Sequence, residues 1–169
     1  MSETKTLEGT KLLIVDDEPD VLETLKEQLD MCDIDTAADF ATGEKLLNQN
    51  KYDIAVLDIM GVKGYELLEI ANKKGVPALM LTAAALSPDN FVKSISEGAE
   101  AYIPKEKMAE IAIFLSDLLK SQDGTEKPYK WFYQLKSFFN VLFGSNWIYK
   151  YQEFKKEAER KYGPINWDD

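Results

Sequence analysis

The stretch Lys11-Leu-Leu-Ile-Val-Asp16-Asp17 combines a short apolar run with two carboxylates that follow it directly. An apolar run without alternation is typical of a strand that is buried on both faces, as in a parallel sheet covered by helices. Pro19 suits the first turn of a helix, and apolar residues at helical spacing continue to about Asp30. The segment therefore predicts a strand that ends in acidic side chains and leads into a helix.

The alternation of strand and helix continues to residue 121. Further strands are predicted at 34–37, 52–58, 76–82 and 101–103, the first of them weak. Further helices are predicted from Asp39 to Leu47, over 65–74 up to Gly75, from Ser87 or Asp89 to about Gly98, and over 106–120. Five strands and five helices in alternation predict an α/β fold, namely a doubly wound five-stranded parallel sheet with helices on both faces, in a flavodoxin-like arrangement.

Composition limits the class of protein. The 169 residues are 45% hydrophobic and 30% charged, which is ordinary for a globular chain and argues against wholesale disorder. No apolar run is long enough to predict a membrane span, and the first ten residues lack the pattern of a secretory signal. The single cysteine, Cys32, fits a reducing compartment, so we expect a cytoplasmic protein. Because the chain has no histidine, histidine-based zinc sites and a phosphohistidine are excluded.

Charge and aromatic content divide the chain into two regions. Residues 1–123 hold 12 basic and 24 acidic residues, whereas residues 124–169 hold 8 basic and 6 acidic ones. The last 46 residues contain 13 of the 19 aromatic residues, including all three tryptophans. The acidic main body argues against nucleic acid as a partner, since binding it requires Lys and Arg to neutralise phosphates. We predict a main domain at 1–121, a linker at 122–128 and an aromatic-rich helical extension at 129–169.

Polar side chains follow four of the predicted strands. The first strand ends in Asp16 and Asp17, the third in Asp58, the fourth in Thr82 and the fifth in Lys105. Each residue alone has an ordinary explanation: acids favour a helix N-terminus, a threonine often forms a cap or turn, and a loop lysine is usually solvated. Ligands of doubly wound sheets, however, bind beyond the carboxyl ends of the strands. The conjunction therefore predicts a functional site at that edge.

Three carboxylates at one edge of a sheet require a compensating positive charge. Two carboxylates about 5 Å apart repel each other by about 3 kcal/mol at an effective dielectric constant of ~20. A raised pKa, the Lys105 ammonium or a divalent cation must relieve this repulsion. Mg²⁺ suits oxygen ligands and recruits phosphoryl groups, and a carboxylate can accept a phosphoryl group as an acyl phosphate. We expect Lys105 and the Thr82 hydroxyl to bind the other phosphoryl oxygens during such a transfer.

In this order, the residues resemble the receiver domain of two-component response regulators. The matching residues are Asp16-Asp17, Asp58, Thr82 and Tyr102-x-x-Lys105, together with Val56-Leu-Asp-Ile-Met60 and Gly64-Tyr-Glu-Leu-Leu68. The resemblance covers residues 10–121. It implies that Asp58 is the phosphoacceptor and that Thr82 and Tyr102 form a switch pair. It also implies that Mg²⁺ is held by the side chains of Asp17 and Asp58, by the backbone carbonyl of Met60 and, through water, by Asp16.

The resemblance implies a phosphoacceptor switch in a phosphorelay, rather than an enzyme that acts on an external substrate. A histidine kinase or histidine phosphotransfer protein would donate the phosphoryl group, and the domain would catalyse only the formation and hydrolysis of its own aspartyl phosphate. The alternative is an interaction module that keeps the receiver shape and works without phosphorylation. A small-molecule phosphatase is a third possibility. Asp33-Ile-Asp35-Thr36 superficially resembles the haloacid-dehalogenase motif, but no strong apolar strand precedes it.

Two departures from the family pattern motivate the alternative. Glu106 follows Lys105, where family members commonly have Pro, so a cis peptide at this position is not expected. The segment Ile59-Met-Gly-Val-Lys-Gly64 looks about two residues shorter than common versions of this loop. Neither departure removes a reacting group, but both lie beside the predicted site, where they bear on the approach to the metal and on the docking of partners.

The extension has apolar residues at helical spacing over 129–143 and 147–162, separated by Gly144-Ser-Asn146. This pattern predicts a hairpin of two aromatic-faced helices, which is too short for a helix-turn-helix DNA-binding module. The hairpin could pack on the main domain, or it could form a homodimer or dock a partner through residues 129–162. Lys136 is the only basic residue in 131–149, which argues against membrane contact.

Overall fold

A five-stranded parallel sheet forms the centre of the computed structural model, which describes residues 7–83, 86–165 and 167. The strands are β1 (Lys11–Val15), β2 (Asp33–Ala37), β3 (Ile54–Leu57), β4 (Ala78–Thr82) and β5 (Ala101–Pro104). Their order in the sheet is β2-β1-β3-β4-β5, and all neighbouring pairs are parallel. The predicted flavodoxin-like sheet is therefore confirmed, including the weak strand β2.

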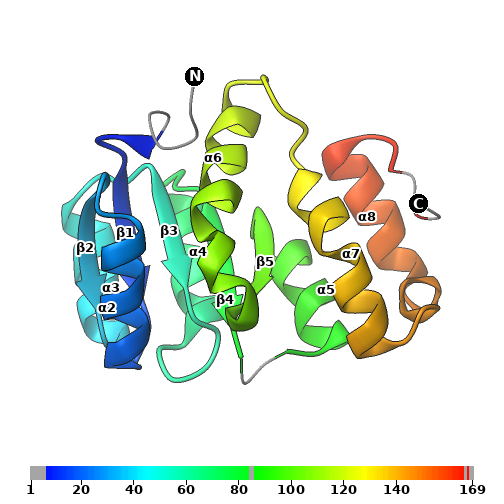
Figure 1. Cartoon of the computed structure of the whole chain (residues 1–169), viewed down its shortest axis with the longest axis horizontal. Coiled ribbons are helices and arrows are strands. Elements are labelled where there is room, and N and C mark those ends of the chain that lie inside the picture. The colour runs from blue at the N-terminus through cyan, green and yellow to red at the C-terminus, as the bar shows by residue number, and fades with distance from the viewer. Residues whose placement is uncertain (1–6, 84–85, 166, 168–169) are drawn as a thin grey trace.

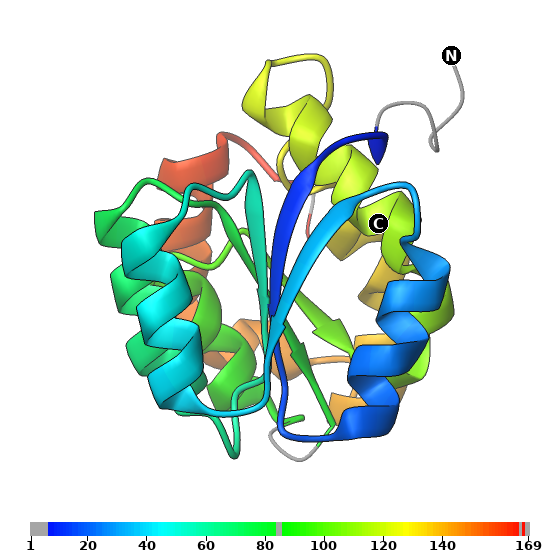
Figure 2. The same cartoon turned by 90° about the vertical axis from the view of Figure 1, so that its left-hand side faces the viewer.

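Helices cover both faces of the sheet. They are α2 (Pro19–Gln28), α3 (Phe40–Gln49), α4 (Gly64–Lys73), α5 (Pro88–Ser96) and α6 (Ile111–Gln122). Figure 2 shows α2 and α6 on one face, and α3, α4 and α5 on the other. Apart from β2 and the first residue of β1, the strands between these layers are buried, which explains the uninterrupted apolar runs at 12–15, 54–57 and 78–81.

Local capping sets where two of the helices begin. The Asp39 carboxylate accepts a hydrogen bond of 2.8 Å from the Thr42 N–H, as expected for the N-cap of α3. The Ser87 hydroxyl accepts a hydrogen bond of 3.1 Å from the Asn90 N–H. Ser87, and not Asp89, is therefore the N-cap of α5.

The helix predicted over 106–120 is wrong in its first part. Residues Lys105–Glu110 form a 3₁₀ helix, and the regular α-helix begins only at Ile111. None of the six residues in the 3₁₀ segment is buried, whereas Ile111 is fully buried. An α-helix gains most of its stability from a buried apolar face, and from this segment only Met108 packs, partly buried, against the core. The Lys105–Glu106 peptide bond is trans.

The extension forms α7 (Lys130–Phe143), a 3₁₀ turn (Trp147–Lys150) and α8 (Gln152–Tyr162). The second helix predicted over 147–162 is thus divided, because the 3₁₀ turn buries the adjacent residues Trp147 and Ile148 together. In Figure 1 the extension lies beyond β5, where α8 contacts α5 and α7 contacts α6. Its apolar residues belong to the same hydrophobic core as the sheet. The aromatic face therefore packs on the main domain of its own chain.

Candidate functional site

The carboxyl edge of the sheet gathers most of the predicted site residues. Val15 is paired with Leu57 in the sheet, so that Asp16 and Asp58 leave β1 and β3 side by side. The Asp58 N–H donates a hydrogen bond of 2.9 Å to the Val15 carbonyl, which holds the two strand ends together. Both carboxylates are buried, with Asp16 2% and Asp58 5% exposed. Parallel pairing in this register is the reason that residues 42 positions apart share one site.

A single ammonium group links the carboxylates. Lys105 Nζ lies 2.8 Å from Asp16 Oδ2 and 3.5 Å from Asp58 Oδ2. It also donates a hydrogen bond of 3.0 Å to Glu18 Oε1. The lysine side chain is 11% exposed, so solvent screens these ion pairs only weakly. Lys105 therefore occupies the position in which the sequence predicted a compensating cation.

Glu18 is a site residue that the sequence analysis missed. The Glu18 N–H donates a hydrogen bond of 2.8 Å to Asp16 Oδ1, and the residue directly precedes Pro19 at the start of α2. This turn directs the Glu18 side chain back toward Lys105. The sequence feature that could have identified Glu18 is its position directly after Asp17. Acidic residues before a helix are common, however, because they favour the helix N-terminus without any further role.

The charges at the site shift two pKa values. Burial and the neighbouring Asp16 carboxylate raise the pKa of Asp58 to about 6, although Lys105 opposes the shift. Burial alone would lower the pKa of Lys105, but its hydrogen bonds to Asp16 and Glu18 outweigh this effect and raise it to about 12. Burial is the main cause of the raised pKa of Asp58, and the Asp16 carboxylate adds to it, so an additional positive charge at the site would favour the ionised form of Asp58.

The acidic residues offer a set of oxygen ligands that fits a hard divalent cation. Carboxylate oxygens of Asp16, Asp17 and Glu18 lie within 4.8 Å of one another. Mg²⁺ takes oxygen ligands and usually retains several waters, so a site open on one side suits it. Of the predicted ligands, Asp16 and Asp17 belong to this group, whereas Asp58 lies outside it and shares the Lys105 ammonium with Asp16. Met60 lies in the adjacent loop with its side chain 54% exposed.

The short loop between Asp58 and α4 folds tightly against the acids. Gly61 has a φ of +83°, and a Cβ at this position would overlap the Asp17 carboxylate. A Cβ on Gly64 would overlap the backbone carbonyl of Asp58. Lys63 adopts the left-handed conformation at the N-cap of α4, with a φ of 54°. This loop thus depends on two glycines that allow its backbone to approach Asp17 and Asp58.

The predicted switch residues lie on the two neighbouring strands, fully buried. Thr82 is the last residue of β4 and is paired with Pro104 of β5, next to Lys105. The Tyr102 hydroxyl accepts a hydrogen bond of 3.2 Å from the Ser87 N–H at the start of α5. Burial raises the pKa of Tyr102 above its usual range, so the phenol stays protonated at neutral pH. Thr82 therefore lies at the acidic edge, whereas the Tyr102 ring lies under α5.

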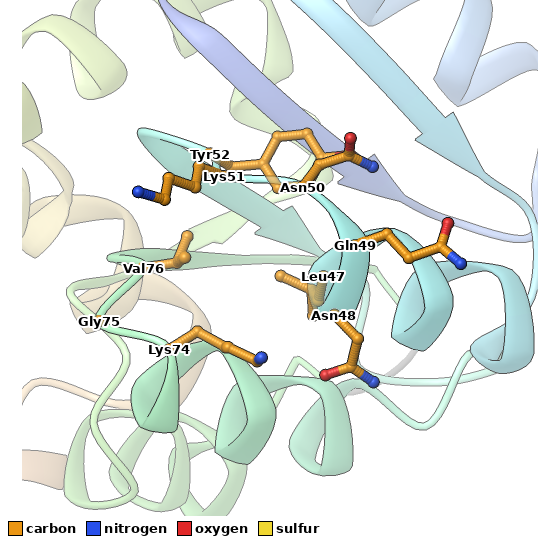
Figure 3. A pocket seen from close by; sticks show the side chains of 9 residues that line it. All are labelled: Leu47, Asn48, Gln49, Asn50, Lys51, Tyr52, Lys74, Gly75 and Val76. Carbon is orange, nitrogen blue, oxygen red and sulfur yellow. The ribbon is translucent and has the colours of Figure 1, made fainter.

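A cavity of about 390 Å³ lies at the opposite edge of the sheet and has a different chemistry (Figure 3). It lies between the segment that leads from α3 into β3 and the segment that leads from α4 into β4. None of the nine lining residues is acidic, and two of them are lysines, Lys51 and Lys74. This cavity cannot supply the carboxylates that the predicted chemistry needs.

In the part of the chain that the structure describes, no helix has the length and apolar character to cross a membrane.

Comparison with known proteins matches residues 12–114 to the family described as the response regulator receiver domain. The chain is 38% identical to the heme response regulator HssR of Staphylococcus haemolyticus over 101 residues, which are 56% of this chain and 44% of HssR. It spans about half the length of the curated relatives that it matches.

Two solved structures share the fold. A CheY-like receiver domain protein from Methanospirillum hungatei is 30% identical with a TM-score of 0.59, and the match covers 69% of this chain and all of that one. The beryllofluoride-activated receiver domain of DrrB from Thermotoga maritima is 26% identical with a TM-score of 0.55, and the match covers 63% of this chain and 93% of that one. Both matches leave about a third of this chain uncovered.

Proposed function

The chain belongs to the response regulator receiver domain family of two-component systems, and from this premise we propose that Asp58 is its phosphoacceptor. The single observation that carries the proposal is the position of Lys105, whose ammonium lies within 3.5 Å of both Asp16 and Asp58. A buried carboxylate beside a fixed ammonium can receive a phosphoryl group whose negative charge the ammonium then stabilises. The partner that donates it would be a histidine kinase or a histidine phosphotransfer protein.

The transfer places each residue in a defined role. A carboxylate oxygen of Asp58 bonds to phosphorus while the bond between phosphorus and the donor's histidine nitrogen breaks, and the electron pair leaves with that nitrogen. Lys105 shifts from the acids to a phosphoryl oxygen, and the Thr82 hydroxyl donates a hydrogen bond to another. The pKa of about 6 keeps Asp58 mostly ionised at neutral pH, as a nucleophile must be.

Mg²⁺ is the cofactor that the oxygen ligands suit. Asp16, Asp17, Asp58 and the Met60 carbonyl would hold it, as the family resemblance implies, and Glu18 adds a carboxylate within reach. When bound, the ion neutralises the excess negative charge of the acids and of the incoming phosphoryl group. The Gly61 backbone, folded over Asp17, keeps this carboxylate at the edge of the sheet.

The domain would act as a signalling switch that phosphorylates and dephosphorylates only itself. We place it in the cytoplasm, and we expect its signal to pass through protein contacts rather than through nucleic acid. A homodimer or a docked partner that uses residues 129–162 would have to bind the outer face of the extension, because the inner aromatic face is buried. HssR is named as a response regulator, but the match spans less than half of it, so its output is not transferred to this chain.

The proposal is tested by incubating the protein with Mg²⁺ and acetyl phosphate and recording its intact mass. We expect one phosphoryl adduct, which Asp58→Asn abolishes. Asp53→Asn is the matched control, because Asp53 is an exposed carboxylate just before the same strand, at its opposite end. An adduct that survives Asp58→Asn, or the absence of any adduct at saturating Mg²⁺, contradicts the proposal. The second outcome favours the phosphorylation-independent interaction module, and multiple turnovers on an external phosphoester would indicate a phosphatase.

A further inference from the structure

Phe91 of α5 is the centre of an aromatic cluster that joins the receiver to its extension. Its fully buried ring lies 5.0 Å from that of Trp147 and 5.1 Å from that of Phe139, measured between centroids. The rings of Phe154 and Trp131 lie at 5.4 Å and 5.7 Å. Most of these pairs meet edge to face, which is the favourable geometry for aromatic rings. One receiver side chain therefore contacts α7, the 3₁₀ turn and α8 together.

Tyr102 belongs to the same cluster and connects it with the phosphorylation site. Its ring centroid lies 5.3 Å from that of Phe91 and 6.1 Å from that of Phe139. The residue stands three positions before Lys105 on β5, and its hydroxyl binds the first turn of α5. Because the ring is fully buried and packs against Phe91 and Phe139, a displacement of the ring disturbs both contacts.

Polar contacts hold the extension in one position on the receiver. The Tyr151 hydroxyl donates a hydrogen bond of 2.8 Å to the Asp89 carboxylate at the start of α5. Lys161 of α8 donates one of 3.2 Å to the Ala99 carbonyl, just before β5. Such directional contacts favour one docked arrangement over a family of loosely packed ones. A small displacement of α5 or β5 therefore changes the energy of the docked extension.

We propose that the extension is the intramolecular partner through which this receiver signals, and that the ring contacts among Tyr102, Phe91 and Phe139 couple its position to the state of Asp58. The inference rests on the proposed function, since it requires that Asp58 be modified. Packed interiors tend to switch between discrete arrangements, so a shift of Tyr102 is passed to α7 rather than absorbed. Coupling is reciprocal in equilibrium binding, so a change in this cluster also alters the affinity of the site for its ligand.

The chain contains its own reporter of this coupling. All three tryptophans lie in the extension, and Trp131 and Trp147 contact Phe91 directly. Beryllofluoride with Mg²⁺ serves as the probe that mimics the phosphoryl group on Asp58. We expect tryptophan emission to change as beryllofluoride saturates the site, and hydrogen exchange to change in α7 and α8. Asp58→Asn should abolish both responses.

Two matched variants locate the pathway. Phe139→Leu removes the ring of α7 that contacts Tyr102, and we expect it to change the apparent affinity for beryllofluoride by about fivefold. Phe143→Leu is the control on the same helix. Phe143 contacts the rings of Phe139 and Trp147, but in the described part of the chain it has no ring contact with Phe91 or Tyr102. The Phe143→Leu variant should bind beryllofluoride with the affinity of the unchanged protein. Circular dichroism checks that both variants fold.

The outcomes separate this inference from the proposed function. If acetyl phosphate gives no adduct on Asp58, the proposed function fails. If the adduct forms but tryptophan emission and hydrogen exchange of α7 and α8 stay unchanged, the proposed function stands and the inference is overturned. Equal effects of Phe139→Leu and Phe143→Leu overturn the pathway through Tyr102. Should Phe139→Leu fail to fold, hydrogen exchange of the unchanged protein with and without beryllofluoride still decides the coupling.

Discussion

The carboxyl edge of the sheet and the aromatic cluster around Phe91 are both buried, but they contribute to stability in opposite ways. At the sheet edge, Asp16 and Asp58 share the charge of one lysine, and burial, together with the repulsion from Asp16, raises the pKa of Asp58. In the cluster, apolar rings replace water contacts with one another. The difference teaches that the receiver carries a costly site for its chemistry and that the extension adds stability next to it.

The largest effect is expected from Phe91→Ala, which removes the centre of the aromatic cluster. Loss of a fully buried phenylalanine typically costs about 3–5 kcal/mol in the free energy of unfolding. Urea denaturation followed by circular dichroism measures the change. Tyr149→Ala is the control, since this side chain is 43% exposed and its loss should cost within about 0.5 kcal/mol. Equal costs for both variants would contradict the view that the extension stabilises the receiver through Phe91.

Asp58→Asn should change the free energy of unfolding in the opposite direction to Phe91→Ala. It should stabilise the metal-free protein at neutral pH. The native pKa of about 6 lies above the usual value of 3.8, so the folded state disfavours the ionised carboxylate. The shift corresponds to at most about 3 kcal/mol in the free energy of unfolding. This destabilisation is fully present above the native pKa and disappears only as the pH falls below 3.8, where the carboxyl becomes protonated in both states.

Urea denaturation in EDTA at pH 7.5 and pH 4.5 tests whether Asp58→Asn raises or lowers the free energy of unfolding. The gain in the free energy of unfolding from Asp58→Asn should be largest at pH 7.5 and reduced to about a third at pH 4.5, because the unfolded carboxyl is still mostly ionised there. Asp53→Asn, which alters an exposed carboxylate, should show no comparable gain at either pH. A loss of stability on Asp58→Asn at pH 7.5 would mean that Lys105 stabilises the ionised carboxylate more than burial and Asp16 disfavour it.

Gly61→Ala should weaken metal binding at the acidic edge of the sheet without removing a charged group. The added methyl group displaces the Asp17 carboxylate, and changes in the groups that orient a metal ligand typically cost about tenfold in affinity. Gly75→Ala is a close control, because Gly75 has a φ of +73° but no atom within 4 Å of the added Cβ. Calorimetric titration with Mg²⁺ measures both variants. Equal affinities for the two would show that the loop does not position Asp17.

The smallest effect is expected from Glu18→Gln. Glu18 lies 3.0 Å from Lys105, but its side chain is 58% exposed, so the ion pair should contribute less than about 1 kcal/mol to stability. The same variant shows whether Glu18 binds the metal. If Glu18 binds the metal, its substitution lowers the affinity for Mg²⁺. If Glu18 only pairs with Lys105, the affinity for Mg²⁺ stays nearly unchanged. A stability loss as large as that of Phe91→Ala would contradict the exposed position of this pair.

Much of the fold could be predicted because its signals are local. The apolar strands, the N-cap at Asp39 and the helix stop at Gly75 each depend on residues within a few positions of one another. The acids at the ends of β1 and β3 could be placed together because parallel strands align their carboxyl ends. The 3₁₀ segment after β5 was not foreseen, since its sequence has ordinary helix formers and only the lack of burial distinguishes it.

The sequence by itself determined the parallel sheet, the acidic edge with Asp58 and Lys105, and the two helical stretches of the extension, because periodicity and strand-end residues are properties of neighbouring positions. Only the tertiary structure decided that Glu18 contacts Lys105, 87 positions away, and that the aromatic face covers α5 of the same chain. Such contacts depend on how whole layers pack, and an aromatic helix face in the sequence suits an internal interface as well as an external one.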